Sequence, residues 1–531
     1  MKIKQLFSCA NNSQVILSLA ILFLTATSFN ILTFPTVDSV AKFIHLLILI
    51  YAACVIHYFI FCLYRQSRIL WAVVTLLIFT LNALIFYAVK YFQIAVNYNL
   101  IFDILGNSKA ELLQYSTIIN IGFIPYLLTL VLIPFAILNF LLKRQYIYYY
   151  YSKVSFTWLL LLSLLCGSAA HLLYESKYYE AQRSNIKLIT ARFSPNNYII
   201  ASFRFYQKNR RVMKTNLPEI ASDARLENTD KLKTVILVVG ESARSDHFSL
   251  NGYVRDTNPQ LSKIQNLFSF SHMESCSTST WHSVPCIFSS KNADSFSLPV
   301  DRKNLLDLLT RLGLEVYWLS SQGSCITTCD NVINKKISLS GDKEILNELE
   351  IVINEKQTQD RLIVLHHQGS HYPYYTNFKP RHALFTPFCK ENDFIHLCSQ
   401  KEVVNAYDNT LIATDEFIAK IIGIADAQQD SNTMLIFTSD HGQSLGENGT
   451  FAHNKPKIIA PLEQLHVPLI LWLSDNITKS LNIDHQSLNN IAKNEHFSHD
   501  NIFSSILGIF NVKTQAYNPA LDLLSTEIAA P

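Results

Sequence analysis

Several acidic and imidazole side chains stand just after short apolar runs of the sequence. Glu241 follows the run 234–239, the pair Asp440–His441 follows 434–438, and His366, His367 and His371 follow 361–365. Each residue alone is compatible with a solvated loop or a helix cap. Together they are of the types that Zn²⁺ binds in proteins, carboxylate and imidazole. The set therefore predicts a metal site at these strand ends, with its ligands drawn from among these residues.

A hydroxyl-rich segment supplies candidates for a nucleophile. Residues 275–286 read SCSTSTWHSVPC and lead into an apolar stretch typical of a helix start. A hydroxyl at a helix N-terminus lies in a positive potential that favours an alkoxide and a bound anion. The alternative is an ordinary Ser or Thr N-cap. A metal ion favours the catalytic interpretation, because coordination activates a hydroxyl that is otherwise a poor nucleophile.

Short strands and helices must position these residues. Apolar runs predict strands at Thr234–Val239, Glu315–Leu319, Arg361–Leu365, Met434–Thr438 and Pro468–Leu473, and helical patterns cover Lys303–Leu312, Val403–Ile422 and Asp500–Phe510. Strands that alternate with helices are typical of a largely parallel sheet covered on both faces. In such a sheet, ligands bind outside the carboxyl ends of the strands, and this is where the candidate residues stand.

Six cysteines of this half of the chain form three close pairs, Cys276/Cys286, Cys325/Cys329 and Cys389/Cys398. An even set of neighbouring cysteines predicts three disulfides and an oxidising compartment. The alternative is a zinc site, for which only Cys325 and Cys329 have a spacing close to that required.

The composition divides the chain in two. It has 531 residues, of which 49% are hydrophobic and 16% charged. Residues 1–174 contain only ten Lys/Arg and three Asp/Glu, whereas the remainder has 34 and 38. This distribution excludes an intrinsically disordered chain, a single soluble domain and a nucleic-acid binder with a basic face. It predicts a transmembrane domain at 1–174, a linker or bridging segment at 175–230 and a globular domain at 231–531.

Five apolar segments are long enough to cross a bilayer. They are about 14–34, 40–64, 70–92, 121–142 and 154–174. Lys and Arg concentrate before the first span, between the second and third, and between the fourth and fifth, whereas the other two connections are nearly balanced. The positive-inside rule then places the N-terminus in the cytoplasm. Because five is odd, the globular domain is expected outside the cytoplasm, in agreement with its paired cysteines.

The chain resembles the phosphoethanolamine transferases that modify lipid A or lipopolysaccharide core, a family that includes the mobile colistin-resistance enzymes. The matching strings are VGESARSDH at 239–247, NGYVRDT at 251–257, SCSTSTWHSVPC at 275–286, NAYDNT at 405–410 and SDHGQSLGENG at 439–449. The resemblance implies a five-helix membrane domain and a periplasmic α/β domain of the alkaline-phosphatase/sulfatase type. It also implies a multi-pass protein of the inner membrane.

The resemblance also implies a role for individual residues. Glu241, Thr280, Asp440 and His441 are expected to bind the catalytic zinc, and Thr280 rather than Thr278 is the expected nucleophile. His371 and His453 match residues that contact phosphate or a second zinc, and His366 matches a further family histidine. Asp103 and Glu111 lie in a segment similar to the family's lipid-binding loop.

Three positions depart from the family pattern. Gln443 stands where Glu commonly follows Asp-His-Gly, which puts a second zinc ion in doubt. Ser277 replaces a common Gly, and Asp103 replaces a usual Asn.

The reaction implied by the resemblance is transfer of phosphoethanolamine from phosphatidylethanolamine to lipid A or lipopolysaccharide core. It proceeds through a covalent phospho-threonine, and the enzyme is expected to be a monomer that confers polymyxin resistance when lipid A is the acceptor. Three alternatives remain at this point: a phosphoglycerol transferase of envelope glycans, a phosphatase or phosphodiesterase, and a membrane-anchored binding module without activity.

Overall fold

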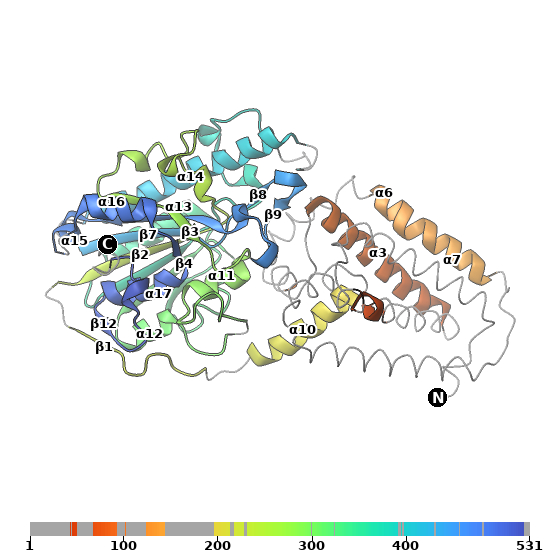
Figure 1. The fold of residues 1–531 in the computed structure, drawn as a ribbon, viewed down its shortest axis with the longest axis horizontal. Coiled ribbons are helices and arrows are strands. Elements are labelled where there is room, and N and C mark those ends of the chain that lie inside the picture. The colour runs from red at the N-terminus through yellow and green to blue at the C-terminus, as the bar shows by residue number, and fades with distance from the viewer. Residues whose placement is uncertain are drawn as a thin grey trace. The chain divides into compact units, whose positions relative to one another are not determined.

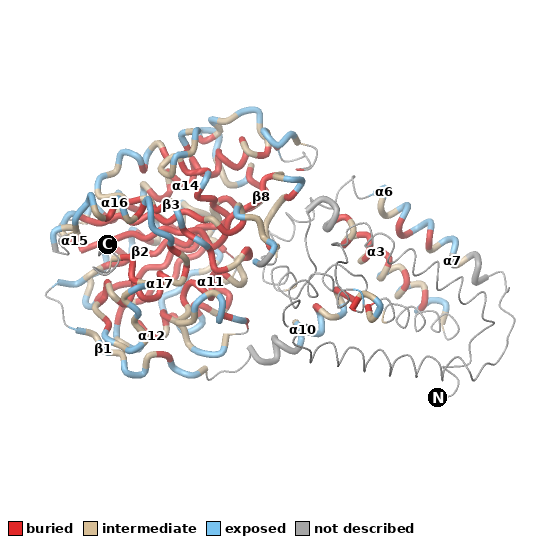
Figure 2. Tube along the Cα trace, in the orientation of Figure 1, coloured by how far each residue is buried: buried red, intermediate tan, exposed pale blue. Residues whose placement is uncertain are grey.

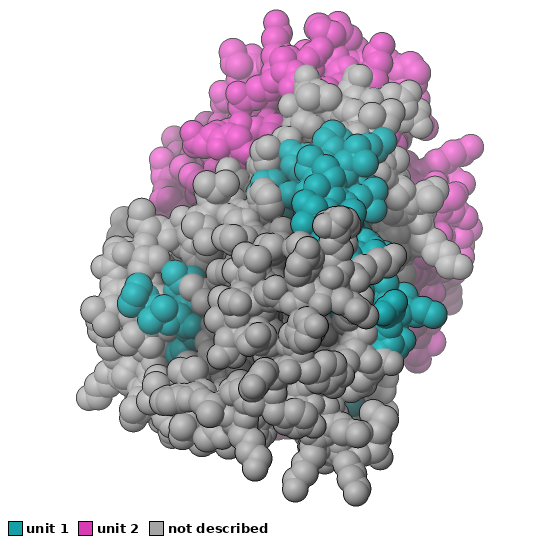
Figure 3. Space-filling model, turned by 90° about the vertical axis from the view of Figure 1, so that its right-hand side faces the viewer, with its two compact units in different colours: residues 1–101, 116–206 teal, residues 102–115, 207–531 magenta. Residues whose placement is uncertain are grey.

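The structure is a computed structural model of the chain. It describes residues 217–227, 231–298, 300–322, 324–390, 395, 398–428, 432–455, 457–480 and 483–524, and in the first part of the chain residues 43, 45–49, 52, 67–92, 101, 124–143 and 196–212. The chain divides into two compact units, residues 1–101 with 116–206 and residues 102–115 with 207–531 (Figure 3).

Apolar helices form the described part of the first unit. The predicted third span corresponds to helix α3 (Arg68–Phe92), and the predicted fourth span to a continuous helix composed of α6 (Ile124–Tyr126), the π-helical turn η3 (Leu127–Leu132) and α7 (Ile133–Lys143). Pro134 has no N–H to donate, which accounts for the wider turn before it. Within the described residues, only Arg68–Tyr87 is long and apolar enough to cross a membrane, and Ile124–Ile137 is shorter.

The other predicted spans cannot be compared in full. The first, the fifth and most of the second lie outside the described residues, although residues 43, 45–49 and 52 are helical. The segment predicted as a linker contains helix α10 (Asn196–Val212), in which Asn196 donates to the Leu49 carbonyl at 2.7 Å.

The second unit is built on a mixed sheet. Its eight strands in the described residues, in spatial order, are β11 (Phe497–Ser498), β3 (Leu267–Glu274), β10 (His466–Leu473), β7 (Asn432–Ser439), β2 (Lys233–Gly240), β6 (Arg361–His366), β4 (Glu315–Ser320) and β5 (Asn334–Lys336). Two short pairs lie apart, β1 (Arg225–Leu226) with β12 (Val512–Lys513), and β8 (Ser444–Leu445) with β9 (Phe451–Ala452). In the eight-stranded sheet, β10 runs antiparallel to both of its neighbours and the other neighbouring strands are parallel. This sheet is therefore mostly but not wholly parallel.

Helices cover both faces of this sheet. Helices α11 (Thr280–Ile287), α12 (Leu305–Arg311) and α17 (Asp500–Ile509) share one core with Val235, Leu237 and Val239 of β2. Helix α14 (Gln400–Asp426) lies on the opposite face, and the remaining helices are α13 (Asp342–Asn354), α15 (Asp475–Ser480) and α16 (His485–Asn494) (Figure 1). The central strands are buried between these layers (Figure 2). Strand β5, at one end of the sheet, is exposed. Because β2 is covered on both faces, its residues from Val235 to Val239 are all apolar and fully buried.

The register of the central strands sets the position of the site. Gly240 at the end of β2 is opposite Ser439 at the end of β7, and Val239 is opposite His366 at the end of β6. β3 and β11 run in the same direction as β2, β6 and β7, because only β10 is reversed and it lies between β3 and β7. The chain segments that follow these five strands therefore emerge at one edge of the sheet.

Candidate active site

Glu241, Asp440 and His441 meet at this edge and are fully buried. Within the described residues they are the one group of three or more acidic, His or Cys side chains whose ligand atoms all lie within 4.8 Å of one another. Nε2 of His441 lies 3.4 Å from Oε1 of Glu241 and 3.4 Å from Oδ2 of Asp440. The register explains the meeting, since Gly240 and Ser439, which precede the two carboxylates, are paired across β2 and β7.

Thr280 completes the cluster. It is the first residue of α11 and is only partly buried, and its hydroxyl lies 3.0 Å from Oε2 of Glu241 and 3.1 Å from Nε2 of His441. Thr278, in contrast, donates its hydroxyl to the Lys455 carbonyl at 2.5 Å. The structure therefore brings Thr280, and not Thr278, to the carboxylates and the imidazole.

The charges of this cluster suit a cation. Burial raises the pKa of Glu241, but the nearby His441, His371 and His453 have a larger opposite effect. Overall, the pKa of Glu241 is lowered to about 2. Burial and the neighbouring Glu241 raise the pKa of Asp440 well above its usual range. Two carboxylates this close in a buried site repel each other, and a divalent cation between them relieves the repulsion.

The lone pairs also suit a metal. Oδ2 of Asp440 is buried and has no hydrogen-bond partner among the described residues, whereas Oδ1 accepts from the backbone N–H groups of Ser242 and His441. Nδ1 of His441 donates to the Gly442 carbonyl at 2.8 Å, which leaves Nε2 as the acceptor nitrogen. A backbone carbonyl that fixes the tautomer of a histidine in this way is a common feature of metal ligands. Burial lowers the pKa of His441, so its ring is neutral and able to bind a metal.

The histidines expected to contact phosphate or a second zinc lie near Glu241, Asp440 and His441 but are not members of that group. The His453 ring is stacked on His441 with ring centres 4.1 Å apart, and its Nδ1 lies 3.1 Å from the Thr278 carbonyl. His371 is buried and acts electrostatically on Glu241. His366 is fully buried at the end of β6, where its ring meets Trp318 and burial lowers its pKa to about 4. Asp103 and Glu111 lie outside the described residues.

The substitution at position 443 is accommodated by a hydrogen bond. Gln443 is buried, and its Nε2 donates to the Tyr374 hydroxyl at 3.0 Å. The amide is neutral, whereas a glutamate at this position would carry a negative charge.

The loop that carries Thr280 is held at several points. A disulfide joins Cys276 to Cys286, so that the loop and the end of α11 are linked covalently. Ser283 accepts from the Ser277 N–H at 3.0 Å and donates to the Ser277 carbonyl at 3.1 Å. Among the described residues, disulfides also join Cys325 to Cys329 and Cys389 to Cys398, as their spacing predicts.

One residue that positions the Thr280 loop was not predicted from the sequence. His499 accepts from the Cys276 N–H at 3.0 Å through Nδ1 and donates to the Ser439 carbonyl at 3.0 Å through Nε2. It thereby ties the loop that carries Thr280 to the end of β7, which precedes Asp440 and His441. The signal was weak, because β11, the strand that places His499, has two residues.

A motif after β2 anchors this edge to α14. Arg244 donates to both carboxylate oxygens of Asp246, at 2.6 and 2.9 Å, and its backbone N–H donates to the Tyr407 hydroxyl. Asp408 of α14 accepts from the Tyr253 hydroxyl at 2.9 Å and from Arg255 at 2.7 Å. Arg244, Asp246, Arg255 and Asp408 thus hold the scaffold and are not members of the cluster.

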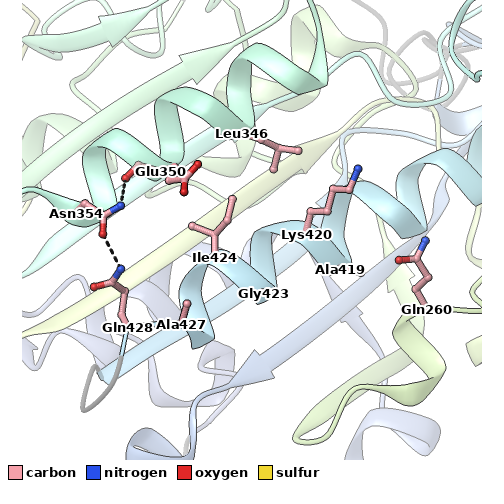
Figure 4. A pocket seen from close by; sticks show the side chains of 10 residues that line it. All are labelled: Gln260, Leu346, Glu350, Asn354, Ala419, Lys420, Gly423, Ile424, Ala427 and Gln428. Carbon is pink, nitrogen blue, oxygen red and sulfur yellow. Dashed lines mark hydrogen bonds between the residues drawn. The ribbon is translucent and has the colours of Figure 1, made fainter.

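The cavity between α13 and α14, of about 650 Å³, is a separate feature (Figure 4). It contains none of the predicted site residues. Its lining residues are Gln260, Leu346, Glu350, Asn354, Ala419, Lys420, Gly423, Ile424, Ala427 and Gln428.

Comparison with known proteins identifies the family. Residues 233–512 match the sulfatase family. The phosphoethanolamine transferase EptA of Escherichia coli K12 is 37% identical over 386 residues, which is 69% of this chain and 70% of the relative. The chain belongs to the phosphoethanolamine transferases of the sulfatase superfamily. The phosphatidylethanolamine transferase Mcr-1 of Escherichia coli is 36% identical over 303 residues, 53% of this chain and 54% of that protein.

A solved structure of this transferase family extends the likeness to both units. The integral membrane lipooligosaccharide phosphoethanolamine transferase A of Neisseria meningitidis matches with a TM-score of 0.77 and 28% identity, and the match covers 96% of this chain and 98% of that one. The expected family and the sulfatase-type sheet are confirmed. The number of five membrane helices is not established by the described residues.

Proposed function

We propose that this transferase moves phosphoethanolamine from phosphatidylethanolamine to lipid A or lipopolysaccharide core, and that Thr280 carries the group between the two lipids. The observation that supports this role is the contact of the Thr280 hydroxyl with both Glu241 and His441, at 3.0 and 3.1 Å. The Neisseria relative is named for a lipooligosaccharide acceptor, which is the same chemical class.

We further propose that Glu241, Asp440, His441 and Thr280 hold a zinc ion. Two buried carboxylates, an unpartnered Oδ2 of Asp440 and a neutral His441 ring are a donor set that zinc accepts. When bound, zinc lowers the pKa of a coordinated hydroxyl and offsets charge on phosphoryl oxygens. His371 and His453 are proposed to contact the phosphoryl group or a second ion.

The first step forms a bond between Oγ1 of Thr280 and phosphorus, and breaks the bond from phosphorus to the diacylglycerol oxygen. The hydroxyl proton of Thr280 leaves toward Oε2 of Glu241, to which the hydroxyl donates. The diacylglycerol oxygen takes up a proton as it departs. The product is a phosphoethanolamine ester of Thr280.

The second step reverses these roles. A phosphate oxygen or sugar hydroxyl of the acceptor attacks the phosphorus, the bond to Oγ1 breaks, and Thr280 regains a proton. Two displacements at one residue remove the need to bind both lipids together. The partly buried position of Thr280 leaves its hydroxyl accessible to each lipid in turn.

The membrane arrangement belongs to the same proposal. The charge pattern of the short loops supports a cytoplasmic N-terminus and a periplasmic catalytic unit in the inner membrane. This arrangement lets the catalytic edge reach donor and acceptor lipids at the periplasmic surface. We propose that the enzyme works as a monomer.

The decisive experiment compares Thr280→Ala with Thr280→Ser in cells and in purified enzyme. We expect Thr280→Ala to abolish both the phosphoethanolamine adduct on the protein and the mass increase of lipid A or core, measured by mass spectrometry. Thr280→Ser keeps a hydroxyl and should retain a measurable adduct. An adduct on another residue in Thr280→Ala would refute the assignment.

The same spectra separate the alternative reactions. A phosphoglycerol transferase would add a different mass to envelope glycans. A phosphodiesterase would release phosphoethanolamine to water and leave lipid A unmodified.

A further inference from the structure

Three histidines gather at the edge of the sheet, apart from the catalytic cluster. His272 lies on β3, His466 begins β10 and His496 immediately precedes β11. The ring centres of His272 and His496 are 4.8 Å apart, and those of His272 and His466 are 6.2 Å apart. His272 and His496 are exposed to solvent and His466 is partly buried. The catalytic mechanism uses none of them.

The strand register places all three on one face. Met273 pairs with Val467 and with Phe497, and all three side chains belong to the buried core. The residues that alternate with them, His466 and His496, therefore point to the opposite face. The register between β3 and β10 shifts between Val467 and Leu469, where an extra residue of β3 is accommodated. This bulge turns the exposed His272 to the same outer face, between the other two histidines.

The spacing of the rings suits a shared metal ion. With a Zn–N distance of about 2.1 Å and tetrahedral angles, two imidazoles on one zinc ion have ring centres about 5 Å apart. The observed separations of 4.8 and 6.2 Å lie on either side of this value. The ligand nitrogens of the three rings do not converge in this structure. Exposed side chains change rotamer rapidly, so His272 and His496 can turn toward a shared ion when it binds.

The hydrogen bonding and the charges favour ligation. Nε2 of His466 lies 2.6 Å from the Ser271 carbonyl, so this nitrogen is the donor and Nδ1 is left as the acceptor. A carbonyl fixes the tautomer of His441 in the same manner. Glu274, the register partner of His466, adds a carboxylate to this face, although it is paired with Lys457.

We propose that His272, His466 and His496 form a second site for a divalent transition-metal ion, separate from Glu241, Asp440 and His441. Imidazole ligands select ions such as Zn²⁺, Cu²⁺ and Ni²⁺ over Mg²⁺ and Ca²⁺. The site lies on the outer surface, so an ion reaches it directly from solution. It is independent of the proposed transfer chemistry.

The test measures zinc bound to the full chain in detergent, after removal of metal with a chelator and equilibration with micromolar Zn²⁺ at neutral pH. We expect the double variant His272→Asn/His496→Asn to bind one zinc ion fewer per chain than the wild type, by elemental analysis. Glu241→Gln should lose the catalytic zinc and keep the ion at the histidines. Because the test compares the zinc content of the variants with that of the wild type, its result does not depend on how many ions the catalytic site holds.

A matched control is the exposed His485→Asn on α16, which should bind as much zinc as the wild type. The transfer activity of the double variant should equal that of the wild type, which shows that it is folded. Equal zinc content in the double variant and the wild type would overturn the proposal. Zinc held at these histidines only at millimolar concentration would overturn it as well.

Discussion

At the scale of single residues, Asp440 combines two functions in one carboxylate. Oδ1 accepts from the N–H groups of Ser242 and His441 and so fixes the turn after β7. Oδ2 is left without a hydrogen-bond partner among the described residues and faces the cluster. Hydrogen bonds on one oxygen hold the other in place, which would lower the cost of ordering the site for the proposed metal ion.

Replacing Asp440 by Asn should therefore remove the metal without unfolding the turn. The amide oxygen still accepts at the Oδ1 position, but the charge that a zinc ion requires is lost. We expect at least a 100-fold loss of transfer, together with loss of zinc by elemental analysis. Asp360→Asn is the matched control, since Asp360 is also buried but only accepts from the Lys233 N–H, at 2.7 Å. Full zinc content in Asp440→Asn would show that Asp440 is not a ligand.

Asp415 makes the stability of the catalytic unit depend on pH. Burial raises its pKa to about 6, although the N–H groups of Gln260 and Leu261 donate to it. Because the pKa in the folded state exceeds the unfolded value, the stabilisation is complete below about pH 4 and is lost as pH rises through about 6. The loss approaches about 3 kcal/mol.

Thermal melting at several pH values checks this effect. The melting temperature of the wild type should fall relative to that of Asp415→Asn as pH increases from about 4 to 7. A difference that stays constant with pH would contradict it.

At the scale of elements, the loop after β7 packs tightly against the backbone at Glu463. A Cβ atom at Gly442 would stand 2.2 Å from the Glu463 carbonyl oxygen. The backbone there is fixed, since the Gly442 N–H donates to the Gln464 carbonyl at 3.0 Å. His441, the preceding residue, depends on this fit for its place beside Thr280.

Gly442→Ala should displace His441 and lower transfer at least 100-fold, because a misplacement of about 1 Å has effects of this size in active sites. Gly423→Ala is the control, since a Cβ atom there meets nothing within 4 Å and α14 gains helix propensity. It should raise stability by up to about 1 kcal/mol and keep activity. Transfer assays and melting curves distinguish the two variants, and an active Gly442→Ala would show that the loop can shift.

The central elements could be predicted from sequence, and their surroundings could not. The run Thr234–Val239 is apolar at nearly every position and corresponds to β2, and Val403–Ile422 lies within α14. β3 was missed because LFSFSHME alternates and contains polar residues, and β11 because two residues carry no periodic signal. The antiparallel direction of β10 was missed too, since an apolar pattern is the same in either direction.

The ligand cluster was found for a physical reason. Glu241 and Asp440 each follow a strand that is buried on both faces. The apolar runs before them therefore predict their place at the edge of the sheet. The spacing of the residues could not distinguish Thr280 from Thr278; the family resemblance favoured Thr280, and the path of the loop gives the physical reason. The bond of Thr278 to Lys455, 177 residues away, has no trace in local sequence.

At the scale of the whole molecule, the proposed ligands, the proposed nucleophile Thr280 and the sheet edge all belong to the second unit, within residues 207–531. Its core is formed by its own strands and helices. The first unit contributes apolar helices whose composition suits a bilayer. The catalytic cluster can therefore form without the membrane unit, whereas access to membrane lipids depends on it.

A chain of residues 207–531 exported alone should fold, bind zinc and form the Thr280 adduct with a water-soluble short-chain donor. It should transfer to lipid A in cells at least 100-fold more slowly than the full chain, because anchoring supplies a high effective concentration of both lipids. Mass spectrometry of the adduct and of lipid A measures the two activities separately. A separated unit without zinc would show that the first unit contributes to the site.

The bridge between Cys276 and Cys286 gives this enzyme a dependence that its reaction does not require. The bond encloses Thr280. With the periplasmic arrangement proposed above, it would form only after the chain has crossed the membrane into an oxidising compartment. When that compartment no longer oxidises thiols, newly made chains would lack the covalent link that holds the Thr280 loop, while older chains would keep it. Remodelling of the outer surface would then decline by dilution over generations of growth.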